Sequence, residues 1–120
     1  MDIEEIFPPF GLRITCGPLE LRCVREGDIR EVSELIVSGI YDPDEYLPFL
    51  RRWAEDPPEL IPANTMRFYW GTFATFQPDD WHLVLAVREH GRIVGVQDLT
   101  AKDFPITRSI ETGSWLGRGF

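Results

Sequence analysis

The chain has 120 residues, enough for one compact domain. It carries 12 Lys and Arg residues against 20 Asp and Glu residues, a formal net charge of -8. This balance argues against a nucleic-acid partner, because binding to a phosphate backbone requires clustered basic residues. It is compatible with a cationic substrate such as an amine, and equally with an ordinary acidic soluble protein.

The cysteines and the N-terminus bear on compartment and metal binding. Cys16 and Cys23 are the only cysteines, and no histidine cluster accompanies them, so we expect neither a disulfide framework nor a metal site. Residues 1–5 are acidic where a secretory signal needs a basic start. No apolar stretch approaches the ~18 residues that span a bilayer. We therefore expect a cytoplasmic protein without a membrane partner.

The first third of the chain predicts a strand and a helix. Residues 1–18 are rich in proline and glycine, which predicts an irregular lead-in with a short strand around residues 12–14. From residue 19 the pattern alternates between apolar and polar side chains, which predicts a half-buried strand opening a domain over residues 19–120. Asp28 with Glu31 three residues later resembles a capping box, and Gly39 is a plausible helix end.

The middle of the chain predicts two more helices. Five prolines lie within residues 41–64, and between them residues 45–55 can form a helix that ends at Asp56-Pro57-Pro58. From residue 64 to residue 76 aromatic side chains recur three and four positions apart, which favours a further helix.

The last third predicts three strands. Residues 81–88 are apolar on both faces, as in a central strand. His90-Gly91 predicts a tight hairpin turn into a second strand over residues 92–99, and residues 106–116 are a long strand candidate. Early helices followed by consecutive strands indicate an α+β fold with a mostly antiparallel sheet.

This order resembles the first part of the fold of the GNAT family of acetyl-CoA-dependent N-acetyltransferases. Residues 21–28, Leu-Arg-Cys-Val-Arg-Glu-Gly-Asp, resemble its opening strand and helix cap, and residues 92–95, Arg-Ile-Val-Gly, resemble its third strand. Residues 109–116, Ser-Ile-Glu-Thr-Gly-Ser-Trp-Leu, resemble the fourth strand of the branch that acetylates N-terminal alanines of ribosomal proteins. The resemblance covers residues 19–120 and implies strand, helix, helix and then an antiparallel three-strand meander.

The resemblance implies transfer of an acetyl group from acetyl-CoA to a primary amine, on a small molecule or a protein N-terminus. In this family a Gln/Arg-x-x-Gly-x-Gly/Ala loop and a helix follow the fourth strand and hold the pyrophosphate. Gly117-Arg118-Gly119 does not have that spacing. The expectation is therefore a truncated domain, weak or inactive as this chain alone, that can self-associate through the open edge around residues 110–116.

The resemblance also implies site residues. Glu111 would be the base that takes the proton of the amine, Trp115 and Leu116 would offer backbone groups to the thioester and pantetheine, and Gly117 would let the cofactor approach. The residue types alone leave alternatives open, because Glu111 can be a surface glutamate and Trp115 can be a core residue.

The acceptor pocket is the least determined part. Tyr41, Trp70 and Phe73 are candidate lining residues, although aromatic residues at helical spacing also suit a core. His82 lies in an apolar strand and favours a hydrogen-bonded structural role. Because no catalytic motif is complete, a non-catalytic α+β binding module with an aromatic pocket remains the alternative function.

Overall fold

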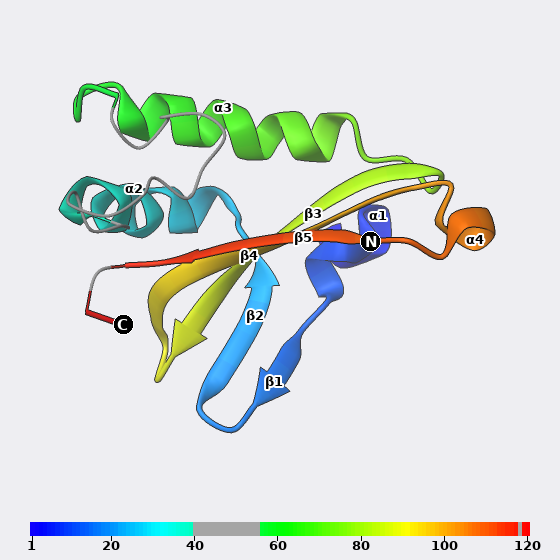
Figure 1. Ribbon diagram of the computed structural model, residues 1–120, viewed down its shortest axis with the longest axis horizontal. Coiled ribbons are helices and arrows are strands. Elements are labelled where there is room, and N and C mark those ends of the chain that lie inside the picture. The colour runs from blue at the N-terminus through cyan, green and yellow to red at the C-terminus, as the bar shows by residue number, and fades with distance from the viewer. Residues whose placement is uncertain (40–55, 118) are drawn as a thin grey trace.

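The computed structural model describes residues 1–39, 56–117 and 119–120. Its five strands form one sheet in the order β1-β2-β3-β4-β5, and every neighbouring pair is antiparallel (Figure 1). The strands are β1 (Ile14–Cys16), β2 (Leu19–Cys23), β3 (Asp80–Glu89), β4 (Arg92–Lys102) and β5 (Glu111–Leu116). The apolar run at residues 81–88 lies in β3, the middle strand, as its pattern predicts.

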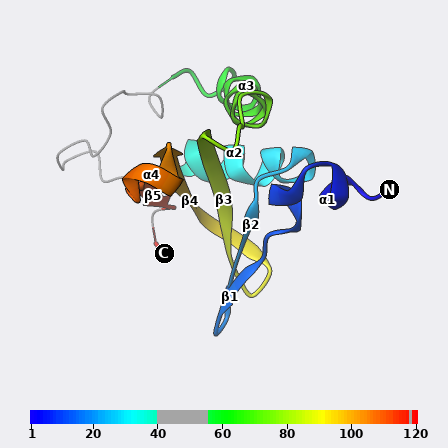
Figure 2. The same ribbon diagram turned by 90° about the vertical axis from the view of Figure 1, so that its right-hand side faces the viewer.

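The two longer described helices lie on the same face of this sheet. Both α2 (Ile29–Ser38) and α3 (Ile61–Ala74) pack there, as the two views together show (Figures 1 and 2). The shorter turns are α1 (Ile3–Ile6), η1 (Pro8–Gly11), η2 (Glu26–Asp28) and α4 (Phe104–Thr107). The predicted α+β class is confirmed. None of the helices in the described residues has the length and apolarity to cross a membrane.

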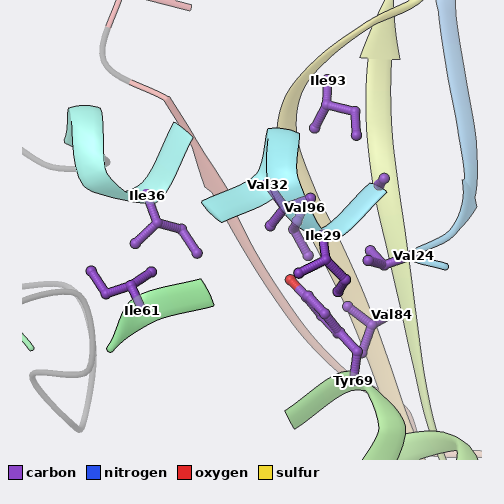
Figure 3. Close-up of a cluster of buried hydrophobic side chains, with 10 residues drawn as sticks. Val24, Ile29, Val32, Ile36, Ile61, Tyr69, Val84, Ile93 and Val96 are labelled. Carbon is purple, nitrogen blue, oxygen red and sulfur yellow. The ribbon is translucent and has the colours of Figure 1, made fainter. Parts of the chain in front are cut away.

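A hydrophobic core fills the space between the two helices and the sheet (Figure 3). Side chains alternate between the faces of a strand, so Val84 and Ala86 of β3 point together toward the helices. Buried side chains of α2 and α3 pack against them. The buried members of this cluster are Val24, Ile29, Val32, Ile36, Ile61, Tyr69, Val84, Ala86, Ile93 and Val96.

The turn between β3 and β4 has the predicted hairpin geometry. His90 and Gly91 both have positive φ, 51° and 80°, as a two-residue turn with the right-handed twist of the flanking strands requires. Arg92 follows directly and starts β4, opposite Glu89. The hairpin prediction from His90-Gly91 is therefore confirmed.

The predicted long strand over residues 106–116 is partly wrong. Its first residues form the short helix α4, and the strand begins only at Glu111. Pro105 occupies the first turn of α4, and Asp103 and Arg108 on either side have left-handed φ values of 51° and 52°. These reversals break the extended chain. The remaining strand still pairs with β4, Glu111 opposite Thr100, so it lies beside the hairpin as expected.

The start of α2 also differs from the predicted capping box. Asp28 makes no side-chain hydrogen bond to the first turn of α2. Its Oδ2 accepts from the backbone N–H of Arg25 instead, and Oε1 of Glu31 accepts from the backbone N–H of Ile93 at 2.8 Å. Asp28 therefore takes part in a capping box of η2, the turn before α2, while Glu31 ties α2 to β4, and neither caps the first turn of α2.

The predicted irregular lead-in is more ordered than its composition suggests. Residues 1–18 contain α1, η1 and β1, and β1 pairs with β2 through Thr15 opposite Glu20. The rings of Phe7 and Phe10 pack edge-on against Phe73 of α3. The helix predicted over residues 45–55 lies outside the described residues.

Candidate functional site

A cavity of about 470 Å³ lies between α3 and the helix-covered face of β3, β4 and β5. The cavity borders the hydrophobic core, because five residues of the buried cluster also line it. The apolar lining residues are Ile36, Ile61, Phe68, Tyr69, Val84, Val96 and Trp115. The polar lining residues are Asp56, Asn64, Thr65, Asp98 and Ser114, with Gly113 beside them.

Asp98 and His82 form a hydrogen-bonded pair at this cavity. Val84 lies opposite Asp98 and His82 lies opposite Thr100, so both side chains point to the helix-covered face. Nε2 of His82 is 2.7 Å from Oδ2 of Asp98, and because a carboxylate only accepts, His82 is the donor. The ring of Phe68 meets the His82 ring edge-on, with 5.7 Å between centroids. The predicted structural hydrogen bond of His82 is thus present, and its partner lines the cavity.

Gly113 of β5 provides space for the Asp98 carboxylate. The two residues lie opposite each other in the β4–β5 pairing. A Cβ atom at Gly113 would be 2.7 Å from Oδ1 of Asp98, closer than two such atoms can sit. Because Gly113 has no side chain, Oδ1 of the Asp98 carboxylate can extend from β4 over β5, on the side away from the His82 imidazole.

Tyr69 of α3 remains protonated beside this carboxylate. Only 4% of the Tyr69 surface is exposed. Burial, together with the nearby negative charge of Asp98, raises the pKa of Tyr69 far above that of a free phenol. The cavity therefore presents a phenol hydroxyl and a carboxylate together. Within the described residues, no group of three or more His, Cys, Asp or Glu side chains could hold a metal ion.

Glu111 lies on the same face as the cavity but does not line it. It is the first residue of β5, opposite Thr100, which in turn lies opposite His82 on β3. These three residues form one row across three strands, on the helix-covered face. The side chain of Glu111 is exposed. The structure therefore places the predicted base at the solvent-facing end of the row.

The three residues predicted near the cofactor lie at the end of β5. Trp115 lines the cavity and packs against the core cluster, while Leu116 is exposed. The N–H of Gly117 donates to the carbonyl oxygen of Val94 at 2.8 Å. A Cβ atom at Gly117 would collide with the side chain of Leu35, so this glycine is needed for the close contact with α2.

The backbone of β5 has one open edge in the described part of the chain. Along an antiparallel strand, residues whose N–H and C=O groups bond to the neighbour alternate with residues whose groups point away. The bond from Gly117 to Val94 sets this alternation. The backbone groups of Thr112, Ser114 and Leu116 consequently point away from β4 and form a row of donors and acceptors.

The structure does not bring the predicted acceptor-pocket residues together. Phe73 packs against Phe10 with ring centroids 4.9 Å apart, on the side of the lead-in, and Trp70 is 41% exposed. Neither lines the cavity, whereas their neighbours Phe68 and Tyr69 do. The aromatic run surrounds the whole of α3, so its spacing could not show which face looks onto the sheet. Tyr41 lies outside the described residues.

Sequence reasoning missed Asp98 as a site residue. The available signal was its position two residues after Val96, on the face of β4 that the alternation assigns to the core. A carboxylate at such a position needs a partner, and His82 in the preceding strand was a candidate for that partner.

Three solved structures with a similar arrangement are described as acetyltransferases, two of them as probable or putative ones. One is RimL, a ribosomal L7/L12 alpha-N-protein acetyltransferase in complex with coenzyme A, with a TM-score of 0.63 and 20% identity over 91% of this chain and 58% of that one. A probable acetyltransferase matches with a TM-score of 0.62 and 17% identity over 92% of this chain and 58% of that one. A putative acetyltransferase gives a TM-score of 0.53 and 18% identity over 90% of this chain and 48% of that one.

These likenesses concern the fold. This chain spans less than two thirds of the length of each of the three structures. No family model matches the sequence. The shared α+β architecture, with its five-stranded antiparallel sheet and α2 and α3 on one face, extends over nine tenths of the chain. This protein therefore has the GNAT acetyltransferase fold, as the resemblance of residues 19–120 implies.

Proposed function

We propose that this chain carries the acceptor cavity and the donor-binding strand of an acetyl-CoA-dependent N-acetyltransferase. The acceptor is a primary amine, on a small molecule or at a protein N-terminus. The single observation that carries the proposal is the cavity beneath α3, which has a carboxylate in its wall and is bounded by the open strand β5. The donor can lie along the open edge of β5, and the acceptor can reach the same strand from the cavity.

The edge of β5 fits the pantetheine arm of acetyl-CoA, which contains two amide groups. Outward backbone groups at Thr112, Ser114 and Leu116 offer donors and acceptors at the spacing of an added strand. Leu116 ends this edge, whereas the backbone groups of Trp115 face β4 and its side chain packs on the core, and Gly117 keeps α2 close behind the strand. When bound, acetyl-CoA supplies a thioester carbonyl that an amine can attack.

An acceptor amine must lose a proton before it can attack, because an ammonium has no free electron pair. Glu111 is the proposed proton acceptor, since it lies on the cavity face of β5 and its exposed carboxylate can pass the proton to solvent. The net charge of -8 favours the approach of a cation toward this surface.

The donor site is tested by adding acetyl-CoA to the ¹⁵N-labelled chain and following its amide resonances. The proposal predicts saturable shifts at Thr112, Ser114 and Leu116. Adenosine 3′,5′-bisphosphate, which lacks the pantetheine arm, is the matched ligand and is expected to leave these three amides unmoved. Resonances that stay in place throughout the acetyl-CoA titration would contradict the proposal.

Ser114→Pro sharpens this test. Proline removes an N–H that points away from β4, so the sheet tolerates it as an edge strand does. We expect the variant to keep its folded spectrum while its affinity for acetyl-CoA falls about fivefold or more, the loss of one hydrogen bond. Unchanged affinity in Ser114→Pro would place the donor elsewhere.

A non-catalytic binding module is the second candidate. The observation that favours it is the apolar wall of the cavity, with the rings of Phe68, Tyr69 and Trp115. Titration with a neutral aromatic compound such as indole separates the two. A module responds with shifts at these three residues and none at Ser114 with acetyl-CoA, whereas an acetyltransferase responds at Ser114.

A further inference from the structure

The carboxylate of Asp98 is fixed on one side and open on another. Its Oδ2 is bound to His82, while its Oδ1 lies over Gly113 and makes no hydrogen bond within the described part of the chain. The side chain of Asp98 is 31% exposed and lines the cavity, so Oδ1 is reachable from within it. A carboxylate held in this way has an acceptor left for a ligand.

The charge around Asp98 suits a cation. No Lys or Arg is among the described lining residues of the cavity, and Asp56 adds a second carboxylate. The hydroxyl of Tyr69 stays protonated near Asp98, and a phenol oxygen accepts hydrogen bonds as well as donating them. In the part of the lining that the structure describes, a carboxylate and neutral oxygens with no Lys or Arg beside them match the three N–H donors of an ammonium group.

We propose that Asp98 binds the ammonium group of the acceptor amine through Oδ1. His82 is the positioning residue that fixes the carboxylate, and Gly113 provides the space in which it lies. The assignment rests on the proposed function for the identity of the ligand as an acceptor. It places the nitrogen directly over β5, the strand along which the donor would lie.

The probe is propylammonium chloride, with 1-propanol as its neutral counterpart, and the readout is the set of amide shifts of Asp98 and Gly113. We expect saturable shifts with the ammonium and none with the alcohol. Asp98→Asn is expected to weaken binding about tenfold or more, since it removes a charge-assisted hydrogen bond. Glu89→Gln removes the same charge at the hairpin end of β3, outside the cavity lining, and its affinity for propylammonium is expected to stay within about twofold of wild type.

Two further variants separate a placed carboxylate from a general negative field. Gly113→Ala keeps every charge, but its Cβ collides with Oδ1 and displaces the carboxylate, so we expect about fivefold weaker binding. Gly71→Ala is the matched control, because a Cβ there meets nothing within 4 Å, and its affinity is expected to equal that of wild type. Equal affinity in Gly113→Ala and Gly71→Ala overturns the proposal.

The role of His82 has its own spectroscopic signature. The chain contains two histidines, and His90 at the hairpin turn serves as an internal reference. Propylammonium is expected to shift the ring ¹⁵N resonances of His82 and not those of His90. His82→Gln, whose amide can also donate to a carboxylate, is expected to bind more tightly than His82→Leu. Shifts confined to His90, or equal affinity of these two variants, count against a positioning role.

The result also distinguishes this inference from the proposed function. If acetyl-CoA shifts Ser114 but Asp98→Asn binds propylammonium as wild type does, the donor site stands and the Asp98 assignment fails. If Asp98→Asn loses the ammonium while acetyl-CoA shifts nothing on β5, the cation site stands and the acetyltransferase proposal fails. Weakening by Glu111→Gln instead of Asp98→Asn also overturns the assignment. The retained folded amide spectrum of each variant is checked first.

Discussion

Arg88 in the middle strand is hydrogen-bonded to Asp28, a residue 60 positions earlier in the chain. The Nη2 and Oδ1 atoms are 2.5 Å apart, and the side chains are only 11% and 20% exposed. Asp28 ends η2, where α2 begins, and its other oxygen accepts from the N–H of Arg25. This contact fixes the start of α2 over β3. It thereby holds the helix whose buried residues cover the sheet in the hydrophobic core.

Arg88→Met is therefore expected to destabilise the protein. It leaves the half-buried carboxylate of Asp28 without its cation, which costs about 2–4 kcal/mol in the free energy of unfolding. Urea unfolding followed by circular dichroism measures this. Arg13→Ala is the control, because the Arg13 side chain is 59% exposed and lies 3.6 Å from Glu20, and loss of this pair changes stability by less than about 0.5 kcal/mol. Equal losses of unfolding free energy in the two variants would contradict a stabilising role of the Arg88–Asp28 pair.

Gly95 is expected to tolerate no side chain. A Cβ atom there would collide with the carbonyl oxygen of Trp115 and the side chain of Leu116, pushing β5 off β4. Gly95→Ala should lower the free energy of unfolding by about 1–3 kcal/mol and speed amide exchange along β5. Gly27→Ala, whose Cβ would meet nothing within 4 Å, is the matched control and should leave both unchanged. Slow exchange in β5 of Gly95→Ala would refute the packing argument.

The pattern of the sequence predicted local structure well and tertiary contacts poorly. Alternation located β2, a run that is apolar on both faces located β3, and His90-Gly91 located the hairpin turn into β4, because these signals lie in adjacent residues. Asp28 was misassigned because a capping carboxylate and one that bonds a distant strand have the same residue type. The predicted strand began too early, at residue 106, because the residue types of Asp103 and Arg108 do not by themselves indicate a positive φ.

The candidate site divides in the same way between local signals and contacts across the sheet. Glu111, Trp115 and Gly117 could be named because they belong to one continuous stretch. The closeness of Asp98 to Gly113 depends on the register between β4 and β5, which is fixed only once β5 begins at Glu111. The placement of Phe73 depends on rings from the lead-in that no periodicity connects to α3.

Stability is expected to fall at alkaline pH through Cys23. Burial raises the pKa of Cys23 from 9.0 to about 11, with the charge of Arg25 acting weakly in the opposite direction. Because the unfolded thiol loses its proton first, the free energy of unfolding is unaffected below pH 9 and falls by about 2–3 kcal/mol as the pH rises toward 11. The raised pKa of Tyr69 acts in the same direction above pH ~10.

Urea unfolding at pH 8 and pH 10.5 measures this fall in stability, and Cys23→Ala should make the fall smaller, with the part due to Tyr69 remaining. Thiol labelling gives a second readout, since Cys16 is exposed and Cys23 is buried. At pH 8 iodoacetamide should modify Cys16 much faster than Cys23. Equal labelling rates, or the same slope in Cys23→Ala and wild type, would be inconsistent with a buried thiol.

Phe73 and Phe68 are expected to affect different properties. Phe73→Ala removes edge-on ring contacts with Phe7 and Phe10, so unfolding should cost about 2–4 kcal/mol less while binding of propylammonium is kept. Phe68 is 52% exposed and lines the cavity, so Phe68→Ala should change stability by about 1 kcal/mol or less and weaken the probe. The reverse pattern would place the acceptor pocket on the lead-in side.

The most direct test of the acetyltransferase account is the position of the acetyl group itself. Nuclear Overhauser effects from the methyl protons of acetyl-CoA to the labelled chain report which residues lie within ~5 Å, the reach of a close packing contact. The account predicts contacts to Ser114 and Trp115 of β5 and to Asp98. Contacts to the apolar hollow formed by Phe7, Trp81 and Leu83, with none to β5, would contradict it.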